Sequence, residues 1–459
     1  MARLDHLSVL DELFVHLEGP NTHMHVGGVT IFEGPAPDYE EVLEMVRSRI
    51  HMVPRFRQKL AMVPLGLGRP VWVDDTHFNL EYHVRHTALP PLGDEVKLKR
   101  MISRVMSQQL DRSKPLWEIW FAEGLTGDRF ALISKTHHCL IDGQSGVDLM
   151  SVMFDFGPEP QRFAPEPWEP DPEPSPDQLL VDAIREHVTS PAELLRTLQS
   201  AAIDPRLVPN RLVESVKALT EFIGGGFSAP PSSLNKPIGP HRRFEMVHAD
   251  LDEFKRVKNS LGGTVNDVVL AVVAGGLRWL FESRGESVDE LELRAMVPVS
   301  VRDRADQGLL GNRIASVWAA LPVYEGDPVT RLRRAHEAMK DIKSSGQAVG
   351  AQVLATLGEF APPTILAQAA RLVARQRAFN LVVTNVPGPQ IPLYAMGRKL
   401  LEVYPVVPLS ENTSIGIALF SYNGSIGFGL IGDYDVASDL AVLAEGIEKS
   451  IAELLQAAG

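Results

Sequence analysis

Residues 129–143 read RFALISKTHHCLIDG, and this stretch carries the pattern that decides the fold and chemistry of the chain. The pattern of residues 129–136 predicts a strand. The strand runs directly into His137 and His138, and an Asp-Gly pair then predicts a tight turn. The first feature to explain is therefore a strand that ends in two adjacent histidines.

Four interpretations of the histidine pair compete. The first is a solvated turn with two hydrogen-bonded histidines and no chemistry. The second is a metal site, since His138 and Asp142 are four residues apart, but the further ligands and glutamate base that zinc chemistry needs are not visible nearby. The third pairs His138 with Cys139 as a nucleophile, but neighbouring side chains on an extended chain point apart, which favours a buried structural cysteine. The fourth is general-base catalysis, because an imidazole with a pKa of about 6.5 can take a proton from an alcohol near neutral pH.

Bulk composition narrows the classes of protein. The chain has 459 residues, which predicts two or three domains, and a formal net charge of −13, which argues against a nucleic-acid binder. Its single cysteine rules out an internal disulfide and fits a reducing compartment. The first residues lack the apolar stretch of a signal peptide, and no apolar run reaches the ~18 residues of a membrane span. We therefore expect a cytoplasmic protein, with at most peripheral contact with a membrane.

The distribution of elements predicts two α/β domains. A stretch with eight prolines between 158 and 176 predicts a stiff, extended linker, so we expect domains at 1–156 and 236–459, joined by a crossover with helices at 157–235. Expected strands cover 24–32, 129–136, 245–251, 291–298, 314–321, 379–385, 414–421 and 426–431. Expected helices cover 39–50, 96–110, 146–154, 252–261, 264–282, 331–345, 351–377 and 440–458, with Thr264 as an N-cap.

The segment HHCLIDG matches the HHxxxDG signature of the CoA-dependent acyltransferase superfamily, which includes chloramphenicol acetyltransferase and the condensation domains of peptide synthetases. Four further segments resemble the bacterial wax ester synthase/diacylglycerol acyltransferases. These are the opening (LSVLD at 7–11 and MHVG at 24–27), PLWE at 115–118, Asn266-Asp267, and NVPGP at 385–389. They come in that family's order and span nearly the whole chain.

The resemblance implies a fold and a reaction. The fold would be two chloramphenicol-acetyltransferase-like domains, each a mixed sheet flanked by helices, with the active site in the cleft between them. The reaction would be transfer of an acyl group from acyl-CoA to diacylglycerol or a long-chain alcohol, which yields triacylglycerol or wax ester. Acyl-CoA would be a co-substrate, and neither cofactor nor metal would be needed. Expected partners are acyl-CoA, a lipid alcohol and the surface of the inner membrane or of a lipid droplet.

The resemblance also implies roles within the histidine motif. His138 would be the general base toward the acceptor hydroxyl, and His137 would support its orientation. Asp142 would be structural and pair with an arginine that the sequence does not identify. Gly143 would permit the tight turn behind the motif.

Roles outside that motif are more open. Asn266 would order the site or donate to the developing oxyanion, although a residue in the first turn of a helix explains it equally well. Pro115, Leu116 and Trp117 would line the acyl channel, although a buried strand edge explains them nearly as well. Arg302 follows a predicted strand and could meet a CoA phosphate, with ordinary surface charge as the alternative.

Two rival functions remain. A related acyltransferase acting on polyketide or peptide-type substrates would share the histidine motif, although the other segments disfavour it and no Ser-bearing carrier motif stands out. A lipid-binding homologue without catalysis would share the fold, although the intact histidines and Asp142 argue against it.

Overall fold

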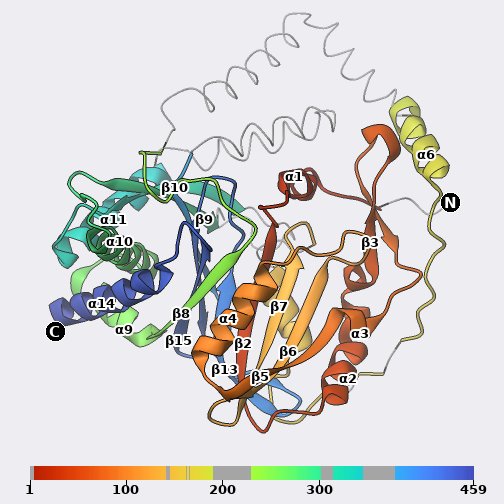
Figure 1. Ribbon diagram of the computed structural model, residues 1–459, viewed down its shortest axis with the longest axis horizontal. Coiled ribbons are helices and arrows are strands. Elements are labelled where there is room, and N and C mark those ends of the chain that lie inside the picture. Colours follow the sequence, from red (N-terminus) through yellow and green to blue (C-terminus); the bar gives the residue numbers. More distant parts are fainter. Residues whose placement is uncertain are drawn as a thin grey trace, which may run out of the picture.

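A computed structural model describes residues 5–140, 145–161, 163–164, 166–189, 229–300, 314–344 and 378–459 (Figure 1). Two six-stranded sheets dominate it, and both are mixed. The predicted two-part α/β architecture, with mixed sheets flanked by helices, is confirmed. The expected helices over 351–377 lie outside the described residues.

The first sheet has the strand order β12-β13-β2-β7-β6-β5. Only β5 and β6 pair in parallel; the other neighbours are antiparallel. The strands are β2 (His25–Glu33), β5 (Val84–Gly93), β6 (Trp117–Leu125), β7 (Arg129–His137), β12 (Tyr394–Ala395) and β13 (Arg398–Val406). The histidine strand β7 is therefore central, with β2 and β6 on its two sides.

The second sheet has the order β10-β9-β11-β14-β15-β8. Strand β11 runs parallel to both β9 and β14, and the remaining pairs are antiparallel. The strands are β8 (Arg242–Asp250), β9 (Glu292–Ser300), β10 (Ile314–Pro322), β11 (Leu381–Pro387), β14 (Ile415–Tyr422) and β15 (Ser425–Asp433). A separate small sheet joins β1 (Asp5–His6), β4 (Val71–Asp74) and β3 (Gln58–Ala61).

One strand exchange links the two halves of the chain. Strand β13 belongs to the C-terminal half, yet it pairs with β2, with Val403 opposite Thr30 and Tyr404 opposite Val29. The first sheet is therefore completed by a segment that the expected boundaries assign to the second domain. The domain boundaries at 156 and 236 stay a prediction. The pairing of β13 with β2 was not predicted from the sequence.

Helices cover the outer faces of both sheets and fill the space between them. The helices are α1 (Val9–Leu17), α2 (Tyr39–Arg49), α3 (Leu80–His83), α4 (Glu95–Met106), α5 (Ser145–Met153), α6 (Pro176–Thr189), α9 (Leu251–Leu261), α10 (Val265–Ser283), α11 (Pro328–Ser344) and α14 (Leu440–Ala458). Short 3-10 helices cover Ile50–Met52, Pro54–Arg57 and Pro64–Gly66. Figure 1 shows α9, α10, α11 and α14 grouped on the outer face of the second sheet, with α4 between the two sheets.

Strand β7 is buried on both sides because its consecutive apolar side chains point alternately to its two faces. Ala131 and Ile133 pack with α4 in the core between the sheets, whereas Phe130 and Leu132 pack with α2 on the opposite face. A central strand buried on both faces is a rigid support, so the residues at its end are held in fixed positions.

Candidate active site

The end of β7 holds both histidines by their main chain. Strand β7 ends at His137, whose backbone N–H donates to the Leu116 carbonyl oxygen at 2.9 Å. The His138 backbone N–H donates to the Met24 carbonyl oxygen at 2.9 Å. Three segments singled out in the sequence, around 24–27, 115–118 and 137–138, thus meet at one place.

His137 is a neutral side chain. Its ring is 1% exposed, and Nδ1 accepts a hydrogen bond from the Cys139 backbone N–H at 3.1 Å, which assigns the ring proton to Nε2. Burial, together with the nearby positive charges of Arg112 and His138, lowers the pKa of His137 to about 3. A residue that stays uncharged near neutral pH suits the orienting role predicted for it.

His138 follows the last residue of β7 and is half-buried. Its imidazole stacks on the Phe14 ring, with the ring centroids 3.9 Å apart and the planes inclined by 21°. Stacking on one face restricts rotation of the imidazole, while incomplete burial leaves the side chain within reach of a substrate.

Two charged residues that the sequence did not single out lie beside His137. The Glu18 side chain is 4% exposed, and its Oε2 lies 2.5 Å from Arg112 Nε and 3.7 Å from His137 Nε2. Burial raises the pKa of Glu18, and the Arg112 guanidinium opposes that rise. The sequence offered one indication of a role for Glu18: this residue lies between the segments 7–11 and 24–27, which both resemble the family's N-terminus.

Cys139 has the surroundings of a structural residue. It is 4% exposed and packs in an apolar cluster with Leu7, Val15 and Leu116. Burial raises the pKa of its thiol well above the usual value, so the thiol stays protonated. These surroundings disfavour a nucleophilic cysteine and support the buried structural one.

Pro115, Leu116 and Trp117 are buried where the chain enters β6. The Trp117 ring stacks between Phe56 and His83, with centroid distances of 4.4 and 4.6 Å, and its Nε1–H donates to the Phe56 carbonyl oxygen at 2.8 Å. These contacts agree with the alternative interpretation, in which the three residues are packed at a buried strand edge. The acyl-channel role of the three residues stays a prediction.

Asn266 is the second residue of α10, in the C-terminal half of the chain, and is half-buried. Its neighbour Asp267 forms a capping box with Thr264, as the predicted N-cap requires, and accepts a hydrogen bond from His336 Nδ1 at 2.8 Å. Among the described residues, no hydrogen bond or ring contact joins Asn266 to the His137–His138 turn. Its oxyanion role stays a prediction. Asp142, Gly143 and Arg302 lie outside the described residues.

A small hollow lined by two histidines and one arginine adjoins the histidine turn. This hollow lies between the two sheets and encloses about 240 Å³ when the space open to solvent is counted. Its lining residues are His23, His25 and Arg242 and apolar residues of α4, β15 and the end of β13. His25 Nε2 accepts from the Leu110 N–H, and His23 Nε2 faces the Pro20 carbonyl oxygen at 3.0 Å. Burial lowers the pKa of both histidines, so this wall of the cavity is lined by neutral imidazoles.

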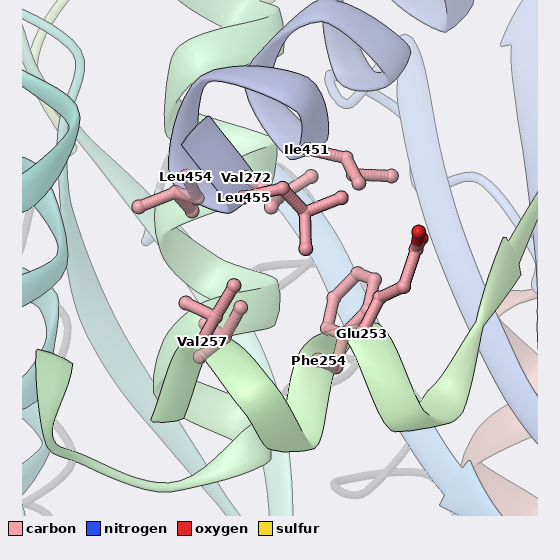
Figure 2. A pocket seen from close by; sticks show the side chains of 8 residues that line it. Glu253, Phe254, Val257, Val272, Ile451, Leu454 and Leu455 are labelled. Atoms are coloured by element: carbon pink, nitrogen blue, oxygen red, sulfur yellow. The ribbon is translucent and has the colours of Figure 1, made fainter. Parts of the chain in front are cut away.

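A second hollow lies far from the histidines. Figure 2 shows apolar side chains of α9, α10 and α14 around this shallow hollow, with Phe254, Val272 and Leu454 among the lining residues. It carries a single charged group at its edge, Glu253, and contains no candidate for acid–base chemistry.

The part of the chain that the structure describes holds neither a candidate metal site nor a single membrane-spanning helix. No group of three or more histidine, cysteine, aspartate or glutamate side chains is arranged to hold a metal ion. No single described helix is long and apolar enough to span a membrane; α9 and α10 reach that length and composition only together, and the two are bent by 99° relative to each other.

Comparison with known proteins completes the assignment. The model of the wax ester synthase/diacylglycerol acyltransferase catalytic domain matches residues 7–269, and the model of the WS/DGAT C-terminal domain matches residues 310–455. A Mycobacterium tuberculosis protein named probable diacylglycerol O-acyltransferase tgs1 is 35% identical over 98% of this chain and 96% of its own length. The wax ester synthase/diacylglycerol acyltransferase from Marinobacter aquaeolei VT8 is similar in structure, with a TM-score of 0.73, 29% identity and coverage of 99% of this chain and 100% of that one.

The likeness of fold extends further. The first condensation domain of the CDA synthetase matches with a TM-score of 0.58 at 16% identity, over 100% of this chain and 98% of that one, which shows a shared fold. The first family model alone spans more than half of the chain, and a relative at 35% identity covers nearly all of it. The resemblance in the sequence is thus confirmed: the chain belongs to the wax ester synthase/diacylglycerol acyltransferase family.

Proposed function

We propose that this chain transfers an acyl group from acyl-CoA to the hydroxyl of diacylglycerol, or of a long-chain alcohol, with His138 as the general base. The observation that carries the proposal is the end of β7, where a half-buried His138 follows a fully buried, neutral His137. The name of the tgs1 relative favours diacylglycerol as the acceptor.

The chemistry needs one base. His138 takes the proton of the acceptor hydroxyl, and the alkoxide oxygen attacks the thioester carbonyl carbon, which forms the new C–O bond. The tetrahedral intermediate collapses, the C–S bond breaks, and the CoA thiolate takes the proton back from His138. A thiolate is already a good leaving group, so no covalent acyl-enzyme is required. Asn266 is our candidate for the oxyanion donor and Arg302 for a phosphate contact.

Thiol release tests the proposal. Purified parent protein and His138→Ala are compared with palmitoyl-CoA against diacylglycerol, monoacylglycerol and fatty alcohols, and His248→Ala, an exposed histidine on β8, is the matched control. General-base catalysis contributes roughly 10²- to 10⁴-fold, so His138→Ala should lose about that much while the control keeps the parent rate. A folded His138→Ala variant that releases thiol at the parent rate would show that His138 is not the general base. Transfer from a carrier protein, with none from free CoA, would instead favour a condensation-type enzyme.

We also propose peripheral contact with a lipid surface, because diacylglycerol and fatty alcohols reside there. The connection between β3 and β4 exposes Met62, Leu65 and Leu67 to 54%, 83% and 45%, with no charged residue between 61 and 68. Vesicles that contain diacylglycerol should co-sediment with the parent and bind Leu65→Asp more weakly. Equal binding of both proteins would place the contact elsewhere. The cytoplasmic location and the independence from cofactors stay predictions.

A further inference from the structure

Helix α1 contacts both histidines of the turn. Phe14 stacks on His138, and Glu18, the C-cap residue of α1, lies beside His137. In the view of Figure 1, α1 lies at the upper end of the first sheet. We propose that Glu18, braced by Arg112, and Phe14 are positioning residues that orient the His137–His138 pair for proton transfer. This inference rests on the proposed function.

A carboxylate at the position of Glu18 is expected to lower the stability of the folded protein. A carboxylate at the C-terminus of a helix meets the negative end of the helix dipole. Glu18 is also nearly fully buried, and burying a charge is costly unless it is paired. Local rules are broken in this way chiefly at functional sites, where another part of the structure compensates.

Arg112 supplies that compensation. Its Nε lies 2.5 Å from Glu18 Oε2, and its Nη2–H donates to the Val15 carbonyl oxygen in the last turn of α1 at 2.7 Å. One guanidinium therefore neutralises the carboxylate and holds the end of the helix. Arg112 is 48% exposed, so it can be replaced with little disturbance of the core.

The effect on the histidines is electrostatic and geometric. Since His137 Nδ1 accepts from the Cys139 N–H, the proton is on Nε2, the atom that faces Glu18 Oε2 at 3.7 Å. The carboxylate favours that tautomer and ring orientation. The His137 carbonyl oxygen in turn accepts from the Leu140 N–H at 3.0 Å, which fixes the turn that carries His138. Both charges of the Glu18–Arg112 pair also bear on His138: the carboxylate favours the imidazolium that forms during the reaction, and the guanidinium opposes it.

Variants at Glu18 separate this role from simple packing. A misplacement of about 1 Å costs on the order of 10²-fold in rate, so Glu18→Gln should lower kcat by roughly 10- to 100-fold and leave KM for palmitoyl-CoA within about twofold. The acid limb of kcat/KM should move to lower pH, because the His138 imidazolium loses a neighbouring anion. Glu18→Asp keeps the charge and should recover part of kcat. Asp439→Asn, which removes an arginine-paired carboxylate in the second unit, is the matched control and should keep the parent profile.

Arg112→Gln should shift the acid limb of kcat/KM in the opposite direction to Glu18→Gln. This variant still tests the inference if Glu18→Gln does not fold. Removing a cation near the histidines should move the acid limb to higher pH. Phe14→Leu should lower kcat without moving the limb, since it removes the stacking but no charge. If His138→Ala is inactive while Glu18→Gln and Arg112→Gln keep the parent kcat and pH profile, this inference fails and the proposed function stands. If His138→Ala is fully active, the proposed function itself fails.

Discussion

The backbone N–H of Cys139 donates to Nδ1 of His137 at 3.1 Å, so the residue after the histidine pair acts on it through its main chain. The thiol points into the apolar cluster formed with Leu7, Val15 and Leu116. The cysteine is therefore part of the site by its position in the turn, while its side chain serves packing.

Cys139→Ala should keep kcat within about twofold of the parent. The bond to His137 comes from the backbone and survives the substitution, and burial raises the pKa of the thiol so that no reactive thiolate is present near neutral pH. The loss of one buried sulfur should cost about 1 kcal/mol of unfolding free energy, the centre of the range for single substitutions. Thiol-release assays and urea titrations measure both. If Cys139→Ala lost as much activity as His138→Ala, the result would support Cys139 as a nucleophile.

His137 should make the protein less stable as the pH falls. Its pKa is about 3 in the folded state, against about 6.5 in the unfolded chain, so the unfolded state binds one more proton between these values. The stability that His137 contributes is fully present above pH 6.5 and is lost as the pH falls toward 3, at about 1.4 kcal/mol per unit. His23 and His25 have lowered pKa values and act in the same direction.

Urea titrations of parent and His137→Asn between pH 7 and pH 5 isolate this contribution. The variant has no group that titrates at this position, so the difference in unfolding free energy between the two proteins should shrink as the pH falls. A difference that is constant with pH would show that His137 binds protons equally in the folded and unfolded states, so that folding does not lower its pKa.

Much of the fold could be predicted from local patterns, and the rest depends on contacts between distant segments. Strand β7 holds a short apolar run before its histidines, and α10 carries a Thr264 cap before a long apolar run, so both were predicted within a residue or two. Strand β5 was not predicted, because Pro90 and Pro91 argue against a strand. The pairing of β13 with β2 joins segments separated by most of the chain, and nothing in either one specifies it.

The residues of the candidate site also fall into those predicted from a local pattern and those that depend on contacts between distant segments. His137 and His138 were predicted because adjacent histidines at a strand end form a local pattern that a family motif reinforces. Phe14, Glu18 and Arg112 were not predicted, because their part in the site arises only when α1 docks on the turn at the end of β7. A helix residue such as Phe14 gives no sign in the sequence of which neighbour it will stack on.

Arg49→Met should destabilise the first unit strongly. Arg49 Nη2 lies 2.5 Å from Asp155 Oδ1, and the two side chains are 4% and 3% exposed, so the substitution leaves a buried carboxylate without its cation. Breaking such a pair costs about 3–5 kcal/mol. Arg49→Met with Asp155→Leu should recover most of the loss in urea unfolding, since apolar replacement of a buried pair is often neutral. A double variant no more stable than Arg49→Met would mean that Asp155 tolerates the lost partner.

Gly388→Ala should destabilise the protein through crowding at the end of β11, within the NVPGP segment. A Cβ at Gly388 would lie 2.2 Å from Phe420 Cε1 and 2.6 Å from the Ser421 carbonyl oxygen, so both a ring and the main chain of β14 must shift. Overpacking of this kind costs about 1–3 kcal/mol, measured as a lower urea midpoint.

Phe420→Leu in the Gly388→Ala background supplies the control. It removes the clash with the ring but leaves the contact with the Ser421 oxygen, so it should restore only part of the lost stability. Because the segment acts here through packing, kcat for the folded fraction of Gly388→Ala should match the parent. A large fall in kcat at unchanged stability would instead give the NVPGP segment a direct part in substrate binding.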